Sequence, residues 1–193
     1  MQTTSHFLMT TLIARNWPRQ SLPISTRALL LGSILPDVAF ILLTLAGEIY
    51  FRWFGTLPTS GSIMEYLHLT LFFTNPIWII GHNFFHSLII NSVLIGLGYY
   101  GWRHAIQSGL LLFWLAVSMQ FHTVIDVFTH ASDGPLLFFP LNGSYRFASP
   151  VSYWESTHWG RVFMPLEYSM DLLIIGYWGW HWWRKNYAHK SAS

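Results

Sequence analysis

The chain alternates between long apolar stretches and short polar connections. A helix needs roughly 20 mostly apolar residues to cross a bilayer, and four stretches have this length: 28–51, 77–102, 108–128 and 166–183. A shorter helix is predicted over 4–14. The segment 131–165 is rich in Pro, Gly, Ser and aromatic residues, which predicts a long outer loop, or lid, over the bundle. We expect residues 1–193 to form a single all-α, membrane-embedded helical bundle.

The basic residues support this arrangement of spans, because cytoplasmic loops carry an excess of Lys and Arg. With the N-terminus in the cytoplasm, the basic residues on the inner side are Arg15, Arg19, Arg27, Arg103, Arg184, Lys185 and Lys190. Those on the outer side are Arg52, Arg146 and Arg161. The sequence therefore predicts four transmembrane helices and a cytoplasmic N-terminus.

The composition favours a membrane protein over a soluble one. Only 9% of the residues are charged, while 52% are hydrophobic and 18% aromatic; soluble domains carry about 25% charged residues. The 11 Trp suit a membrane interface, so membrane lipid is an expected partner. The net charge of +2 and the scattered basic residues argue against nucleic acid. The absence of Cys excludes thiolate metal sites and a cysteine nucleophile.

Ionisable residues interrupt the predicted spans at Asp37, His82, His86, His122 and Asp126. Each costs at least about 2.5 kcal/mol at the centre of a bilayer, so such residues face the bundle interior and find partners there. His130 continues the spacing in HTVIDVFTH, so three ionisable residues share one face of the third span.

The turn between the second and third spans predicts which of these residues are level. Antiparallel helices joined by a short turn align positions at equal distances from its centre, and His104 lies in the middle of YYGWRHAIQS. His86 is then level with His122, and His82 with Asp126. We expect the four side chains to lie at two neighbouring depths, one helical turn apart.

Imidazole and carboxylate groups together are typical ligands of zinc, manganese or iron. His122 and His130 are about 12 Å apart along a helix, so one ion cannot contact this whole face. The pattern predicts a divalent metal site with two ions, or with one ion and an outer histidine. Two alternatives stay open: each histidine is a hydrogen-bonded core residue, and Asp37 caps a helix that resumes after Pro36.

Glu155 and His158 form a further pattern, E-x-x-H after a proline. If a helical turn begins there, both side chains point from the lid into the site. Glu155 would then be a reserve general base and His158 an additional metal ligand. The alternative is a surface turn without contact to the site.

Five ordered motifs resemble those of the membrane-bound metal-dependent hydrolases, a family of small prokaryotic inner-membrane proteins. They are T-S-H at 4–6, G-S-I-L-P-D ending at Asp37, H-x-x-x-H-S ending at Ser87, HTVIDVFTH at 122–130, and the following P-L-L-F-F-P-L. The family is distantly similar to zinc-dependent phospholipase C and related single-strand nucleases, all-helical proteins that hold metal ions for phosphodiester hydrolysis. The resemblance implies zinc and a ligand set of His6, Asp37, His82, His86, His122 and Asp126.

One distance argues against Asp37 as a ligand if the first span is a straight helix. Asp37 lies about 14 Å from the inner end of its helix and His86 about 24 Å from Trp102, a mismatch of roughly 10 Å. A helix break at Pro36, which lacks a backbone donor, would permit a displacement that closes this gap. We expect this break; without it, Asp37 lies outside the site.

These patterns predict a membrane-bound metal-dependent hydrolase that acts on a phosphoester of lipid origin through metal-activated water. Asp126 and the histidines hold the metal, and Asp37 is a ligand or the general base. The substrate enters from the outer half of the bilayer, under the lid.

The alternative is a non-catalytic membrane protein that handles metal ions or protons. A transport path needs polar residues through the whole membrane, but the cytoplasmic halves of the second and third spans are nearly free of them. Bis-histidine haem suits the sequence less, because histidines at four-residue spacing favour adjacent metal ions.

Overall fold

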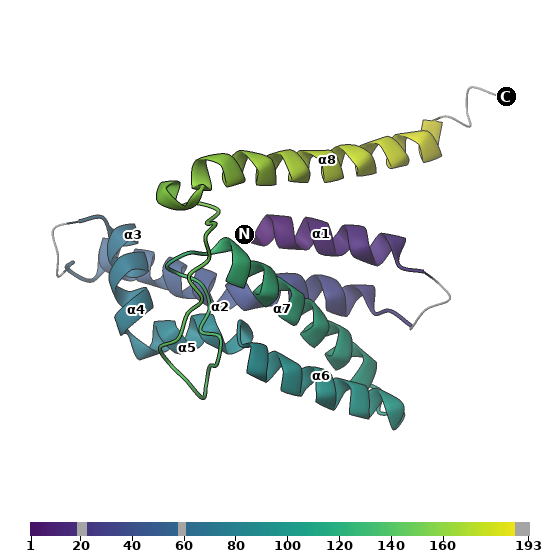
Figure 1. The fold of residues 1–193 in the computed structure, drawn as a ribbon, viewed down its shortest axis with the longest axis horizontal. Coiled ribbons are helices and arrows are strands. Elements are labelled where there is room, and N and C mark those ends of the chain that lie inside the picture. Colours follow the sequence, from purple (N-terminus) through teal and green to yellow (C-terminus); the bar gives the residue numbers. More distant parts are fainter. Residues whose placement is uncertain (19–22, 58–60, 188–193) are drawn as a thin grey trace.

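The computed structural model describes residues 1–18, 23–57 and 61–187. Every regular element within them is a helix, and Leu136 and Arg146 form a single antiparallel bridge. The all-α prediction is confirmed. In chain order the helices are α1 (Thr3–Asn16), α2 (Thr26–Trp53), α3 (Ile63–Glu65), the π-helix η1 (Tyr66–Leu71), α4 (Phe72–Thr74), α5 (Pro76–Phe85), α6 (Leu88–Arg103), α7 (Gly109–Thr129), the 3-10 helix η2 (Ser156–His158) and α8 (Gly160–Tyr187) (Figure 1).

Two of these helices, α2 and α7, are long and apolar enough to cross a membrane. The pair α5 and α6 passes the same test jointly, with a bend of 43° between them, so the described residues contain up to three spans. The prediction of four spans is therefore wrong. The predicted fourth span lies in α8, which contains Glu167 and Asp171 and ends in a run of Trp, Tyr and Gly. Trp and Tyr favour the membrane interface over the bilayer core, so α8 has the length of a membrane span but not the hydropathy of one.

The membrane type, the side of the N-terminus and the single-domain organisation stay predictions. Two of the basic residues used for orientation, Arg19 and Lys190, lie outside the described residues. Four others lie in the last turns of α1, α6 and α8: Arg15, Arg103, Arg184 and Lys185. Basic side chains are favoured at helix C-termini whatever the side of the membrane, which weakens the orientation argument.

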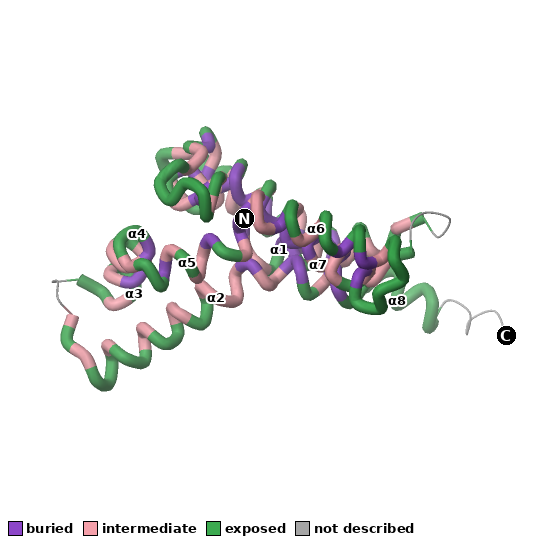
Figure 2. Tube along the Cα trace, turned by 90° about the horizontal axis from the view of Figure 1, so that it is seen from below, coloured by how far each residue is buried: buried purple, intermediate pink, exposed green. Residues whose placement is uncertain are grey.

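The two halves of α2 differ in burial. All its buried residues lie between Ala28 and Pro36, in the N-terminal half. The C-terminal half exposes large apolar side chains, among them Leu42, Leu45 and Ile49, and Figure 2 shows this half projecting from the bundle. An apolar surface of this kind on a helix of spanning length suits contact with lipid acyl chains.

Close packing of α7 against its neighbours depends on glycine. At Gly32 of α2, an added Cβ would meet the backbone oxygen of Leu115 and lie 2.8 Å from Ser118 Cβ, both on α7. At Gly98 of α6, an added Cβ would meet the backbone of Phe113 on α7. Small residues let helix backbones approach closely in this way. As a result α7 lies between α2 and α6, with buried positions along its length (Figure 2).

A short break separates α5 from α6, where the sequence predicts one continuous span. His86 follows the last residue of α5, and Ser87 Oγ caps α6 by accepting a hydrogen bond from the Ile90 amide at 3.0 Å. Asn91 Nδ2 donates to the Phe85 carbonyl, also at 3.0 Å. Polar side chains therefore satisfy backbone groups that a helix end leaves without partners.

The lid segment 131–155 passes across α5 (Figure 1). Asn83 Oδ1 accepts a hydrogen bond from the Leu136 amide at 2.7 Å, and Ser87 Oγ donates to the Phe139 carbonyl at 2.5 Å. The predicted loop is too long, because η2 and α8 begin within 131–165. The helical segment made of α3, η1 and α4 was not predicted.

Candidate metal centre

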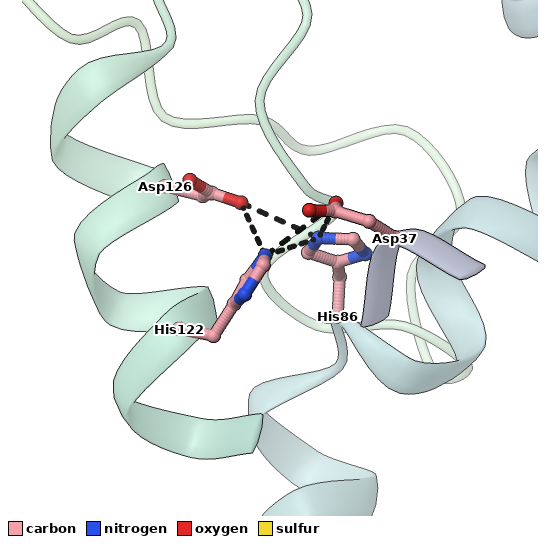
Figure 3. Close-up of side chains that lie close together, drawn as sticks. All are labelled: Asp37, His86, His122 and Asp126. Atoms are coloured by element: carbon pink, nitrogen blue, oxygen red, sulfur yellow. Dashed lines mark hydrogen bonds and ion pairs between the residues drawn. The ribbon is translucent and has the colours of Figure 1, made fainter. Parts of the chain in front are cut away.

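Four of the predicted site residues meet at the level of the break between α5 and α6. Asp37 lies on α2, His86 at the end of α5, and His122 and Asp126 on α7 (Figure 3). One nitrogen or oxygen atom from each lies within 4.8 Å of the other three. No other group of three or more His, Asp or Glu side chains is this compact in the described part of the chain. These four residues, hereafter the metal group, could hold a metal ion.

The distances within the metal group suit a tetrahedral ion. The Nε2 atoms of His86 and His122 are 3.2 Å apart. Asp126 Oδ2 lies 3.3 Å from His86 Nε2 and 3.0 Å from His122 Nε2. Asp37 Oδ1 lies 3.3 Å and 3.5 Å from the same two nitrogens. An ion bound tetrahedrally at about 2.0–2.1 Å places its ligand atoms about 3.3 Å from one another, which agrees with these distances.

Backbone hydrogen bonds orient both imidazoles toward the centre of the metal group. His86 Nδ1 donates to the His82 carbonyl and His122 Nδ1 to the Ser33 carbonyl, each at 2.8 Å. A neutral imidazole that donates from Nδ1 carries its lone pair on Nε2. The two lone pairs then face each other and the carboxylate oxygens, which is repulsive unless a metal ion or a proton lies between them. Metal-binding histidines are oriented by the same kind of hydrogen bond.

The metal group is buried and needs positive charge. The side chains of His86 and His122 are 0% exposed, and that of Asp126 is 4% exposed. Two neighbouring carboxylates in such a place are tolerated only with a cationic partner. The Met1 ammonium group, 3.0 Å from Asp126 Oδ1, supplies one positive charge, and a divalent ion or protons on the imidazoles would supply the rest. The Asp37 side chain is 18% exposed, more than those of the other three residues of the metal group.

Asp37 joins the metal group without a break at Pro36. Helix α2 continues through Pro36, so the predicted break in the first span is wrong, and so is the alternative in which Asp37 caps a helix. Asp37 Oδ1 lies 3.3 Å from His86 Nε2, so the two residues are level although the ends of their helices are not. Asp37 Oδ2 accepts a hydrogen bond from Thr3 Oγ1 at 2.5 Å, which links the carboxylate to α1.

His6, which only the family resemblance suggested, lies beside the metal group. Its Nε2 donates to Asp126 Oδ1 at 2.9 Å, and its ring stacks on His122 with centroids 3.7 Å apart. Asp126 therefore presents Oδ2 to the metal group and Oδ1 to His6 and the Met1 ammonium group. Burial lowers the pKa of His6 below its ordinary value, although Asp126 opposes this, so the neutral form is favoured.

Two further predicted ligands, His82 and His130, flank the metal group. His86 and His122, which the sequence predicts to be level, are in contact, and Asp126 also lies next to His86. That His82 is level with Asp126 stays a prediction. His82 stacks on His86 with centroids 4.4 Å apart. His130 Nδ1 donates to the Asp126 carbonyl at 3.1 Å and lies 3.7 Å from Asp126 Oδ1. Burial lowers the pKa of His130.

The lid residues Glu155 and His158 contact each other and not the metal group. Glu155 Oε1 accepts hydrogen bonds from the amide and the hydroxyl of Ser132, at 3.1 and 2.8 Å. Its Oε2 lies 3.2 Å from His158 Nδ1, and the His158 side chain is 42% exposed. This arrangement corresponds to the surface turn rather than to residues that point into the site.

The pattern of ionisable residues did not reveal the groups that orient the site. Thr3 holds the Asp37 carboxylate, the Ser33 carbonyl holds His122, and Ser87, directly after His86, caps the start of α6. A signal existed for Ser87, because Ser before an apolar run is typical of a helix N-cap. The bond from Ser33 involves only a backbone carbonyl, which no side-chain pattern predicts.

No protein-family model, no curated protein and no solved structure matches this chain. The resemblance to membrane-bound metal-dependent hydrolases, and the ligand set that it implies, therefore stay predictions based on motifs. Function has to be argued from the chemistry of the metal group.

Proposed function

We propose that this protein is a membrane-bound metal-dependent hydrolase that cleaves a phosphoester of lipid origin. The observation that carries the proposal is the metal group, in which two oriented imidazoles and two carboxylates converge at ligand spacing. A divalent ion, zinc by the family resemblance, would activate a water molecule there and offset negative charge on the phosphoryl oxygens.

The residues of the metal group divide into holders and one candidate base. His86, His122 and Asp126 are almost fully buried and would hold the ion. Asp37 is more exposed, and Thr3 fixes one of its oxygens, so it faces an incoming substrate in a defined orientation. A carboxylate in this position would accept a proton from the attacking water.

Support for a lipid substrate comes from the surface that follows Asp37 on α2. Ile41, Leu42 and Leu45 are exposed there, on a helix of spanning length. Acyl chains could lie against these side chains while the phosphoester reaches the exposed carboxylate. The substrate would then approach along α2 from within the membrane.

The alternative, a non-catalytic metal-binding protein, is favoured by one observation. Four protein ligands complete a tetrahedral shell, as in structural zinc sites, whereas catalytic sites keep one position for water or substrate. The hydrolase proposal requires Asp37 to leave that position open, either as the base or as an exchangeable ligand. The role of Asp37, as base or exchangeable ligand on the one hand and as fixed fourth ligand on the other, therefore distinguishes the two functions.

The first test is elemental analysis of detergent-purified protein after incubation with zinc and removal of free metal. The wild type should carry at least one zinc per chain, and His86→Ala and Asp126→Ala should lose most of it. His181→Ala, in an exposed histidine of α8, is the control and should keep wild-type content. A wild type without stoichiometric metal would remove the basis of both functions.

The second test is a panel of phosphomonoesters and phosphodiesters, including short-chain phospholipids, with chelator treatment and zinc add-back. The hydrolase proposal predicts turnover that depends on zinc and falls at least about 100-fold in Asp37→Asn. Zinc bound without turnover of any compound would favour the non-catalytic alternative. Turnover unchanged in Asp37→Asn would exclude this carboxylate as the base.

A further inference from the structure

Arg146, in the lid segment, is a half-buried cation packed on aromatic rings. A guanidinium nitrogen donates to the Gly134 carbonyl. The guanidinium carbon lies 5.2 Å from the ring centroid of Phe72 and 5.4 Å from that of Phe73, so it contacts α4 by cation–π interaction. These contacts hold the side chain against α4, whose Phe72 ring also packs on His82 of α5.

The charge of Arg146 has no ion-pair partner within the described residues. Asp133 influences it from a distance, but Asp133 Oδ2 accepts a hydrogen bond from Trp154 Nε1 instead. Burial lowers the pKa of the Arg146 guanidinium, which shows the desolvation that the charge experiences. A guanidinium carries five N–H donors, and the one carbonyl leaves most of them available.

His82 is a second polar group without a partner. Both of its ring nitrogens are buried, and neither forms a hydrogen bond. The ring lies between His86, at a centroid distance of 4.4 Å, and Phe72, at 4.8 Å. Buried polar atoms nearly always have partners, so such a group calls for a ligand or a water molecule.

The two groups are close enough to bind one anion. Each lies about 5 Å from the Phe72 ring centroid, so the His82 ring and the Arg146 guanidinium are at most about 10 Å apart. The positive charge of Arg146 also acts on His82. A phosphate that accepts hydrogen bonds on opposite oxygens links donor atoms roughly 8 Å apart. One phosphoryl group would bridge these donors where both lie on the same side of the Phe72 ring.

We propose that Arg146 and His82 form a phosphoryl-binding subsite beside the metal group. Arg146 supplies the charge and a pair of parallel donors, and the neutral His82 ring donates one N–H. The identity of the substrate at this subsite rests on the proposed function. Binding of a phosphate can be measured whether or not the protein turns over a substrate. The competing explanation is that Arg146 only anchors the lid through Gly134 and the Phe72 ring.

The test measures phosphate binding to zinc-loaded protein in detergent by isothermal titration, with zinc content determined on each sample. Arg146→Gln should weaken binding of inorganic phosphate at least tenfold without loss of zinc. His82→Phe, which keeps the ring packing and removes the nitrogens, should weaken it severalfold. Arg161→Gln, in an exposed arginine of α8, is the control and should bind like the wild type.

A second series uses dihexanoyl phosphatidic acid, whose headgroup is a phosphate monoester. Tighter binding than inorganic phosphate, lost in Arg146→Gln, would assign the subsite to a lipid headgroup; equal binding would assign it to free phosphate. If Arg146→Gln misfolds, Arg146→Lys preserves the charge and should lose part of the affinity, because lysine lacks the paired donors.

The outcomes separate this subsite from the proposed function. Phosphate affinity unchanged in both Arg146→Gln and His82→Phe would overturn the subsite, and so would a wild type that binds no phosphate at millimolar concentration. Turnover with wild-type KM in these variants would overturn the subsite and keep the hydrolase. Phosphate binding that depends on Arg146, in a protein without turnover, would keep the subsite and reject the hydrolase.

Discussion

Two polar pairs with the same four-residue spacing differ in how they meet the metal group. His122 and Asp126, on α7, both contribute a ligand atom, whereas His86 contributes one and His82 does not. Helix α7 is continuous from His122 to Asp126, so both side chains lie on the same face of the helix. Helix α5 ends at Phe85, so His86 lies at the break while His82 stays in the helix. Spacing predicts which residues share a face, and helix continuity decides which of them reach one ion.

The largest expected effect comes from breaking the α7 pair. His122→Ala removes a buried nitrogen that faces three other ligand atoms, and the remaining three leave an open shell. We expect zinc affinity to fall at least about 100-fold, more than the loss of a group that only orients a ligand. Competition with a chelating dye measures this. Wild-type affinity in His122→Ala would show that the metal group does not bind the ion.

We expect a smaller effect on zinc affinity from a substitution at the contact between α2 and α7. Gly32→Ala places a methyl group against Leu115 and Ser118, so α2 must move away and carry Asp37 from the metal group. Overpacking of this kind destabilises by about 1–3 kcal/mol, and we expect a roughly tenfold loss of zinc affinity. Gly96→Ala is the matched control on α6, because an added Cβ there meets no atom within 4 Å.

Thermal unfolding in detergent, followed by circular dichroism, measures the stability part of this prediction. Gly32→Ala should unfold at a lower temperature than the wild type, and Gly96→Ala at the same or a higher one, because Ala has the higher helix propensity. Equal unfolding temperatures for both variants would mean that α2 does not pack tightly against α7.

The break itself is tested by Ser87→Ala. This change removes the cap of α6 and the hydrogen bond to the Phe139 carbonyl. Loss of a cap costs about 0.5–2 kcal/mol, and zinc affinity should fall severalfold because His86 loses its fixed position. Ser169→Ala, in an exposed serine of α8, is the control. If α5 and α6 joined into one straight helix without loss of zinc, the break would not be what positions His86.

The sequence predicts α2 and α7 well because long apolar runs leave little ambiguity about a helix. It fails at α8, where length and aromatic content resemble a span while hydropathy does not. It also misses the break after His86, because apolar residues continue on both sides of it. There the polar residues Ser87 and Asn91, which satisfy the backbone, were the only local sign.

The candidate site shows the same limit. Register from the turn places His86 against His122 correctly, since both helices run straight between that turn and the break. The same register predicts His82 level with Asp126, and His82 lies beyond the break, outside the metal group. The sequence places Asp37 about 10 Å too near the inner end of the bundle if the ends of the helices are taken to be level. A continuous α2 brings Asp37 to the metal group, so the helix ends are not level.

The smallest effect on metal binding is expected from His82→Phe, which compares the two members of the α5 pair directly. His82 offers no ligand atom to the metal group, and its ring packs on Phe72 and His86, contacts that a phenyl ring can keep. Zinc affinity should therefore stay within about threefold of the wild type, whereas His86→Phe should lose it. If His82→Phe lost zinc as completely as His86→Phe, the imidazole of His82 would have to turn toward the ion on binding. The four-residue spacing of His82 and His86 would then again support a larger site with two ions.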